Sequence, residues 1–194
     1  MNISGTINAL RILYNPSLFL PSVTVSTFND LPVPLPGGPA GSADEIKVVL
    51  LDKDNCFAAP HTNEVWPAYR EQWARLRAQY PGDRLLIVSN TSGSSSDVKG
   101  VQARELEAAT GVRVVQHGGK KPGCYPAILE QLQRDGLVES GRQVAVVGDR
   151  LFTDIAMANL MGGHGFWIRD GVVPHTSVFT GFEKRFYDFM RPKK

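Results

Sequence analysis

The sequence predicts an α/β protein with a central parallel sheet covered by helices on both faces. Three observations lead to this prediction. From residue 44 onward, short apolar runs alternate with segments of helical periodicity, the order that strand–helix–strand units produce. The runs are continuously apolar, as is typical of strands buried on both faces. The length of 194 residues suits one domain with some chain left over for tails or arms.

The first half of the expected sheet comes from two apolar runs and the helix between them. Residues 46–51 read IKVVLL and predict the first strand. Aromatic and leucine side chains then repeat at helical spacing over 66–80, with a proline near the start and another just after the end. Residues 85–88 form the second apolar run, which predicts the second strand.

The second half continues the alternation. Glycines close two expected helices, which span 97–110 and 125–134, and another glycine follows a third helix expected over 153–160. The runs 112–115, 144–147 and 165–168 predict the third, fourth and fifth strands. The sheet is therefore expected to have about five strands.

The two ends of the chain differ from this central part. Residues 1–29 carry a single charged residue, Arg11, and residues 30–43 are rich in proline and glycine, which favours an extended connector. We therefore divide the chain into an apolar arm with its connector (1–43), the α/β domain (44–178) and a C-terminal segment (179–194).

Helical spacing before Pro16 predicts a short N-terminal helix, formed by Ile3, Ile7, Leu10 and Tyr14. Three placements fit this helix: on a membrane surface, in an import signal, or packed on the protein's own core. The C-terminal segment mixes aromatic with basic residues. It suits either contact with anionic head groups or a final helix that packs Phe182, Phe186 and Phe189 on the core.

Composition excludes several classes of protein. The 42% of hydrophobic and 21% of charged residues support a packed core. A net charge of only +2 argues against binding nucleic acid through bulk charge, so no such partner is expected. The two cysteines, Cys56 and Cys124, are too few for a disulfide framework or a four-ligand zinc site. No apolar run reaches the 18 residues of a conventional membrane span.

Unusual polar residues follow three of the expected strands and precede one helix. They lie in the segments 52–55 (DKDN), 89–91 (SNT), 118–122 (GGKKP) and 148–154 (GDRLFTD). In open parallel sheets, ligands bind at the carboxyl ends of the strands. Each piece alone also fits a turn, a helix cap or a solvated loop, but their shared position and order indicate a functional site.

The acidic residues of these segments suggest a metal. Asp52 and Asp54 lie two positions apart and share a side if the strand stays extended. Asp149 adds a third carboxylate, and three like charges repel unless a cation or a proton intervenes. Hard oxygen ligands suit Mg²⁺, which also bridges to phosphate. Neighbouring lysine and serine side chains are then suited to hold phosphate oxygens.

This ordered set resembles the haloacid dehalogenase superfamily of phosphotransferases. Its four motifs match an apolar strand followed by D-x-D (48–54), a strand ending in serine (85–89), a lysine before proline (121–122) and G-D-x-x-x-x-D (148–154). The resemblance implies a Rossmann-like fold with the five strands, numbered along the chain, in the order 3-2-1-4-5. It also implies Mg²⁺ as the cofactor.

The resemblance further implies a role for each residue. Asp52 would be the nucleophile that forms an aspartyl-phosphate, and Asp54 the general acid and base. The side chains of Asp52 and Asp149 and the backbone of Asp54 would hold the metal. Ser89, Asn90 and Lys121 would bind the phosphate. Two secondary candidates remain open: Lys120 as the lysine in place of Lys121, and Asp154 as a ligand through water or as a group that orients the lysine.

Spacing between the motifs leaves no room for an inserted cap domain. Asp54 and Ser89 are 35 positions apart, and Ser89 and Lys121 are 32 apart. Each interval is filled by one expected helix and one expected strand. An uncapped site favours a large or surface-bound substrate over a small soluble metabolite.

A narrower resemblance covers nearly the whole chain. The segments 1–17, 28–32, 51–56, 119–123 and 148–154 are similar to the mitochondrial phosphatidylglycerophosphate phosphatases of fungi. The superfamily usually has threonine or valine where Cys56 stands, but this family carries D-K-D-N-C itself.

The narrower resemblance implies hydrolysis of phosphatidylglycerophosphate to phosphatidylglycerol, a step toward cardiolipin. It also implies peripheral contact with an anionic membrane, on the matrix face of the inner mitochondrial membrane.

Two other functions fit the same motifs. One is a phosphatase acting on a soluble, nucleotide or protein phosphomonoester, and the core motifs do not separate it from a lipid phosphatase. The other is a receiver-like domain or a scaffold without turnover. Receivers also use an aspartate, Mg²⁺ and a lysine, but they lack an acid two residues after the nucleophile, so Asp54 favours an enzyme.

Overall fold

We analysed a computed structural model of the chain, which describes residues 15–37, 45–173 and 178–190. The helix expected before Pro16 lies outside these residues. Among the residues described, no helix is both long and apolar enough to cross a membrane.

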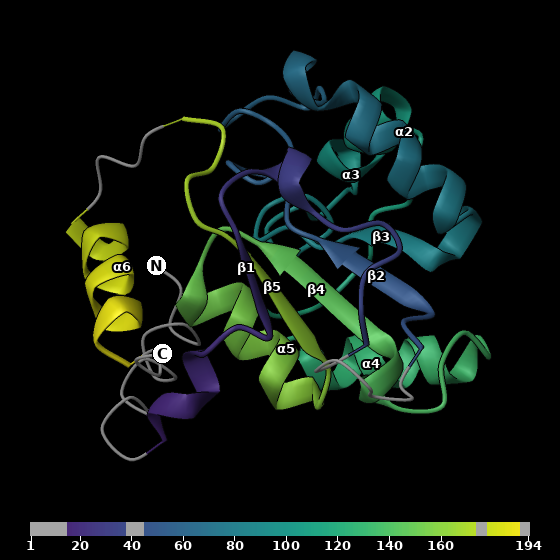
Figure 1. Cartoon of the computed structure of the whole chain (residues 1–194). Coiled ribbons are helices and arrows are strands. Elements are labelled where there is room, and N and C mark those ends of the chain that lie inside the picture. The colour runs from purple at the N-terminus through teal and green to yellow at the C-terminus, as the bar shows by residue number, and fades with distance from the viewer. Residues whose placement is uncertain (1–14, 38–44, 174–177, 191–194) are drawn as a thin grey trace.

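A five-stranded sheet, parallel throughout, forms the centre of the molecule (Figure 1). Its strands lie in the order β1-β5-β4-β2-β3. Their bounds are Val23–Val25 (β1), Val48–Leu51 (β2), Leu85–Ile87 (β3), Val144–Gly148 (β4) and His164–Ile168 (β5). The α/β fold class is confirmed.

The strand order differs in detail from the expected one. The run 112–115 forms only an isolated parallel bridge, between Val114 and Ile87, and no extended strand. At the opposite edge, β1 pairs with β5, with Val23 opposite Phe166. The N-terminal region thus supplies a strand that hydrophobic periodicity did not predict, because β1 has three half-buried residues and no long apolar run.

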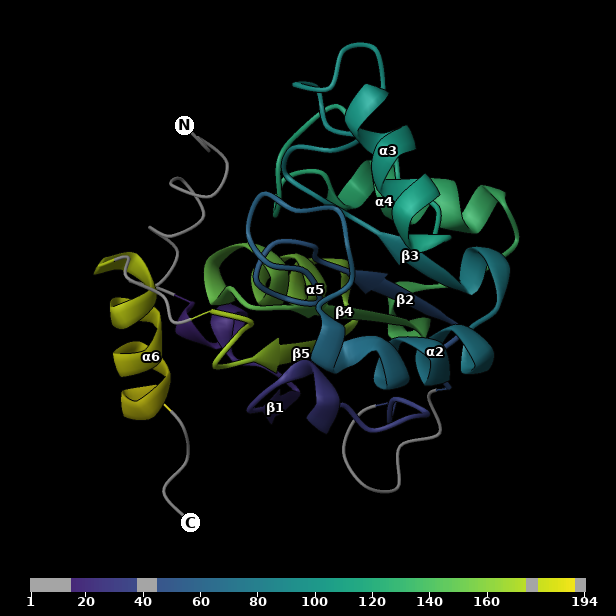
Figure 2. The same cartoon turned by 90° about the horizontal axis from the view of Figure 1, so that it is seen from above.

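Helices cover both faces of the sheet (Figure 2). Leu51 and Val49 point to the face packed by α2 (Arg70–Gln79) and α3 (Val101–Thr110). The alternate residues of β2 face α4 (Tyr125–Arg134) and α5 (Ala156–Met161). This alternation follows from the two-residue period of a strand and explains why the runs are apolar throughout.

A third cluster lies at the β1 edge of the sheet, where both ends of the described chain meet. It joins the 3₁₀ turn Pro16–Phe19, the π-helix Leu151–Ile155 (η7) and α6 (Val178–Met190). Phe19 is fully buried there and meets Phe152 edge to face. The Asn159 side-chain amide of α5 donates to the backbone oxygens of Leu18 and Leu20, at 2.7 and 3.0 Å. Residues 16–25 are therefore part of the folded core.

α6 packs on the core through one face. Phe186 contacts the rings of Phe19 and Phe152, while Tyr187 contacts Trp167 of β5. Phe189 is 85% exposed, and Phe182 is half exposed although it stacks on Phe152. Of the three phenylalanines expected on the core, Phe186 is thus the most covered.

Candidate active site

The site lies at the carboxyl ends of three neighbouring strands. Asp52 follows β2, and its N–H donates to the backbone oxygen of Val147 in β4 at 2.8 Å. Ser89 follows β3 and Asp149 follows β4. Because the strands are parallel and adjacent, the residues after them emerge at one edge of the sheet.

Lys121 lies at the centre of this edge. Its ammonium group pairs with Oδ1 of Asp52 and with Oδ1 of Asp154, the latter at 2.7 Å. Only 1% of its side chain is exposed. The Asn90 side chain helps to hold the lysine loop, because its Oδ1 accepts the Lys121 N–H at 2.8 Å. The neighbouring Lys120 is partly exposed, so the structure brings Lys121 to Asp52.

Lys121 lies beside a cluster of three carboxylates. Each of Asp52, Asp149 and Asp154 places an oxygen within 4.8 Å of the others. When all three carboxylates are ionised, they and the one ammonium group leave a local charge of −2, which a divalent cation would neutralise. The donor set is made of hard oxygens, the ligands that Mg²⁺ prefers. The residues present therefore fit the expected metal, and Asp154 joins the acidic cluster as well as pairing with the lysine.

The pKa values of the cluster show that Lys121 alone does not compensate its negative charges. Burial raises the pKa of Asp52 to about 8, and the negative charges of Asp154 and Asp149 add to the effect, while Lys121 opposes it. Burial alone would lower the pKa of Lys121, but Asp154 and Asp52 outweigh it and hold that pKa well above its usual range. The lysine is therefore charged at neutral pH.

Asp54 lies beside this cluster and not in it. Its carboxylate is 38% exposed and pairs through Oδ1 with the Lys53 ammonium at 2.8 Å. The backbone N–H of His61 also donates to this oxygen, at 3.0 Å. Lys53 is itself buried and donates to the backbone oxygen of Thr62 at 2.8 Å. Both anchors hold Oδ1 of Asp54, so the carboxylate is fixed at the solvent-facing side of the site.

Ser89 is buried at the end of β3, with its hydroxyl 3.0 Å from that of Thr91. The imidazole of His117 lies between the backbone oxygens of Ser89 and Gly119. It thereby joins the serine segment to the loop that carries Lys121. Burial lowers the pKa of His117, although its contacts with the two backbone oxygens oppose the change.

Sequence reasoning missed several residues that support the site. His117 follows the apolar run 112–115 and carries the same signal as the polar residues after the other strands. Lys53 belongs to the DKDN segment. Its burial next to Asp54 depends on the following loop, which places the backbone oxygen of Thr62 on the Lys53 ammonium. Glu183 of α6 accepts the N–H of Phe152 at 3.0 Å, and no local pattern indicates this contact across 31 residues.

The sheet is parallel, and its carboxyl edge carries an acidic cluster with a paired lysine and a D-x-D segment after β2. In these features the chain resembles haloacid dehalogenase-like hydrolases. Within the described segments 45–173, the chain between these groups forms the helices and strands of the sheet domain, with no inserted domain.

Comparison with known proteins identifies the family of the chain. The sequence profile of the family described as mitochondrial PGP phosphatase matches residues 3–173, and the chain belongs to that family. Phosphatidylglycerophosphatase GEP4, mitochondrial, of Saccharomyces cerevisiae is 54% identical over 190 residues, which cover 98% of this chain and 99% of that one.

Two more distant relatives match as well. The probable phosphatidylglycerophosphatase, mitochondrial, of Schizosaccharomyces pombe is 28% identical over 200 residues. The match covers 96% of this chain and 91% of that one. Phosphatidylglycerophosphate phosphatase 1, chloroplastic/mitochondrial, of Arabidopsis thaliana is 36% identical over 60% of this chain and 32% of its own.

Proposed function

We propose that this protein is a mitochondrial phosphatase that hydrolyses phosphatidylglycerophosphate to phosphatidylglycerol and phosphate, a step toward cardiolipin. The family membership supports the substrate. The observation that carries the chemistry is the buried Lys121, which pairs with Asp52 at the carboxyl edge of the sheet. This pairing supports a role of Asp52 as a carboxylate nucleophile next to a cation that can hold an anionic substrate.

In the first half-reaction, a carboxylate oxygen of Asp52 attacks the terminal phosphorus atom. A P–O bond forms to Asp52, and the P–O bond to the glycerol oxygen breaks. Asp54 gives its proton to the leaving oxygen, which becomes the hydroxyl group of phosphatidylglycerol. Its anchored Oδ1 leaves the other oxygen of the carboxyl group for this transfer.

In the second half-reaction, Asp54 takes a proton from a water molecule, which attacks the phosphorus atom and releases phosphate from Asp52. Lys121 and Ser89 bind the equatorial phosphoryl oxygens, where negative charge gathers. Asn90 supports them by holding the lysine loop. Lys121 is favoured over Lys120 for this role because it is the lysine paired with Asp52.

Mg²⁺ is the proposed cofactor. The side chains of Asp52 and Asp149 and the backbone carbonyl of Asp54 would hold it, with Asp154 beside them. When bound, the ion supplies the positive charge that lets an anionic carboxylate approach an anionic phosphate. Within this arrangement the main role of Asp154 is to pair with the lysine, since its Oδ1 lies 2.7 Å from Nζ of Lys121.

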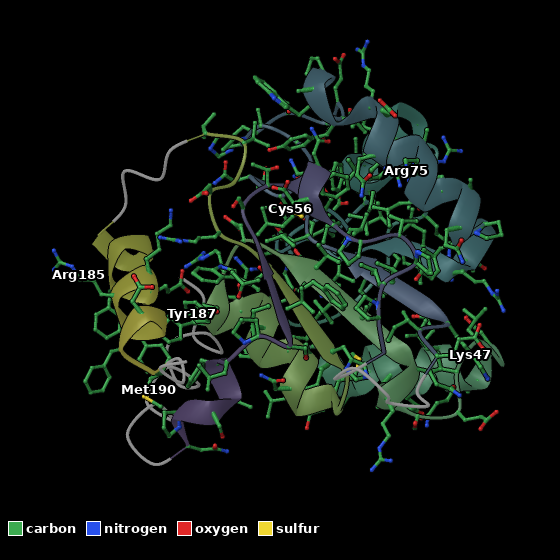
Figure 3. The ribbon with its side chains drawn as sticks, in the orientation of Figure 1. Lys47, Cys56, Arg75, Arg185, Tyr187 and Met190 are labelled. Atoms are coloured by element: carbon green, nitrogen blue, oxygen red, sulfur yellow. The ribbon has the colours of Figure 1, made fainter. Side chains whose placement is uncertain are left out.

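The substrate is presented at a membrane surface. The site has no inserted cap among the described residues, so a head group that stays attached to a bilayer can reach it. We further propose peripheral contact with anionic lipid on the matrix face of the inner membrane. Two residues of α6 support this contact. The aromatic Phe189 is exposed, and the basic Arg185 points outward (Figure 3).

Phosphate release from the purified full chain tests the proposal. Vesicles containing phosphatidylglycerophosphate are compared with soluble phosphomonoesters, each with and without Mg²⁺. We expect Mg²⁺-dependent release with kcat/KM for the lipid at least 100-fold above that for the soluble compounds. Equal or higher kcat/KM for a soluble, nucleotide or peptide phosphomonoester would instead assign the site to that substrate class. No release from any of them would favour a receiver-like or scaffold role.

A further inference from the structure

A buried carboxylate outside the proposed mechanism lies in α6. Glu183 is 1% exposed, and buried acidic groups are costly unless they are paired or hydrogen-bonded. Its Oε1 accepts the backbone N–H of Phe152 at 3.0 Å. Phe152 belongs to the first turn of η7, where backbone N–H groups have no acceptor within the helix. Glu183 thus caps η7 from a helix 31 residues further along the chain.

The capped segment carries two acidic residues of the site. Phe152 lies three residues after Asp149 and two before Asp154. π-Helical turns occur frequently at functional sites, and η7 is such a turn. The backbone N–H of Arg150 adds a contact within the segment by donating to Oδ2 of Asp154 at 3.2 Å.

A second contact from the same direction fixes the start of the segment. The Trp167 indole N–H donates to the backbone oxygen of Asp149 at 2.9 Å. Tyr187 of α6 packs on this indole, with ring centroids 4.9 Å apart, and Figure 3 shows Tyr187 directed toward the sheet while Arg185 points outward. α6 therefore holds both ends of the turn between Asp149 and Phe152. Glu183 binds the N–H of Phe152, and Tyr187 packs on the indole that binds the backbone oxygen of Asp149.

From these contacts we infer that Glu183 is a positioning residue for the metal site, and that α6 fixes the backbone that presents Asp149. The inference rests on the proposed function in one respect, the use of a divalent ion by this cluster. Groups that orient metal ligands from outside affect metal affinity about 10- to 100-fold. Among the described residues, the hydrogen bond of Glu183 goes to the Phe152 N–H and not to a proposed metal ligand. Its removal is therefore expected to weaken metal binding more than phosphate binding.

The test is Mg²⁺ binding by the full chain, measured by calorimetry without substrate. Glu183→Leu removes the acceptor, and we expect its Kd for Mg²⁺ to rise about 10-fold. Glu183→Gln keeps an oxygen at the same place and should stay within about 3-fold of the parent. Asp188→Leu makes the same kind of change at an exposed position of α6 and serves as the matched control.

Two further readouts separate positioning from general damage. The Phe152 amide should lose hydrogen-exchange protection in Glu183→Leu and keep it in Glu183→Gln. Excess Mg²⁺ should restore most of the kcat of Glu183→Leu on p-nitrophenyl phosphate. If Glu183→Leu does not fold, Glu183→Asp, whose shorter side chain withdraws the oxygen, takes its place with the same expectations.

Unchanged Mg²⁺ affinity in Glu183→Leu, or equal loss in Glu183→Leu and Glu183→Gln, would overturn the inference. These measurements do not involve the lipid. Failure of the parent protein to hydrolyse phosphatidylglycerophosphate would therefore count against the proposed function alone.

Discussion

The two adjacent lysines of the 118–122 loop have different environments despite their identical chemistry. Lys121 is buried between Asp52 and Asp154, whereas Lys120 is partly exposed. Lys121→Met should lower kcat/KM at least 100-fold, because the phosphoryl group loses its cation and two carboxylates lose their partner. Lys120→Met, the matched control, should stay within about 3-fold. Steady-state kinetics on a soluble phosphomonoester measures both, and the reverse ranking would assign the role to Lys120.

Asp54 separates an enzyme from a receiver-like domain. Asp54→Asn should slow both half-reactions by about 100- to 1,000-fold, since proton transfer to the leaving oxygen and from water is lost. Rapid-quench kinetics resolves the two steps. His61→Ala is the control: it keeps the backbone N–H that donates to Asp54, so we expect turnover within about 3-fold of the parent. Full turnover in Asp54→Asn would remove the proposed acid and base.

At the scale of elements, the described N-terminal residues belong to the fold. Phe19 is fully buried against η7 and α6, so Phe19→Ala should lower the free energy of unfolding by about 3–5 kcal/mol. Phe189→Ala on the exposed face of α6 should change it by less than about 0.5 kcal/mol. Urea unfolding of both variants measures the difference. Similar stabilities would mean that the cluster around Phe19 adds little to the fold.

The docking of α6 should depend on pH through Glu183. Burial raises the pKa of this carboxyl to about 7, although the Phe152 N–H and Arg150 oppose the rise, while Asp149 and Asp154 add to it. The folded protein then binds this proton more tightly than the unfolded chain does. Stability from this group is present below pH about 4.5, falls as the pH rises toward 7 and levels off above 7.

We expect the parent to lose about 2–3 kcal/mol of unfolding free energy between pH 5 and pH 8 relative to Glu183→Gln. In that variant the buried side chain carries no titrating proton, and other titrating groups are common to both proteins. Urea unfolding at the two pH values gives the difference. Parallel pH profiles for the two proteins would contradict the raised pKa.

The elements also show which helices and strands can be predicted from sequence patterns. Long apolar runs and glycine stops predicted β2, β4, α4 and β5 closely, because burial on both faces and helix termination are local signals. β1 was missed, and the run 112–115 became a single bridge, because pairing at a sheet edge depends on neighbours and not on periodicity. The site followed from polar residues after strands. The contacts of Lys53, His117 and Glu183 join distant segments and have no local signature.

At the scale of the whole molecule, the proposed lipid contact can be tested apart from the chemistry of the site. Because residues 16–25 are part of the core, a truncation that probes the N-terminus must end at residue 14. Removal of residues 2–14 should lower turnover of vesicle-bound phosphatidylglycerophosphate several-fold and leave hydrolysis of p-nitrophenyl phosphate within about 2-fold. Vesicle co-sedimentation should fall in parallel. Unchanged vesicle turnover would mean that this segment has no part in lipid contact.

The central claim is that the side chain at position 52 carries the phosphoryl group between the two half-reactions. Crystals of the full chain grown with beryllium fluoride and Mg²⁺ test this most directly, because beryllium fluoride mimics a phosphoryl group on a carboxylate. The account predicts a fluoroberyllate bound to a carboxylate oxygen of Asp52, with Lys121 and Ser89 on its fluorides. An adduct on another residue, or full phosphatase activity in Asp52→Asn, would contradict it.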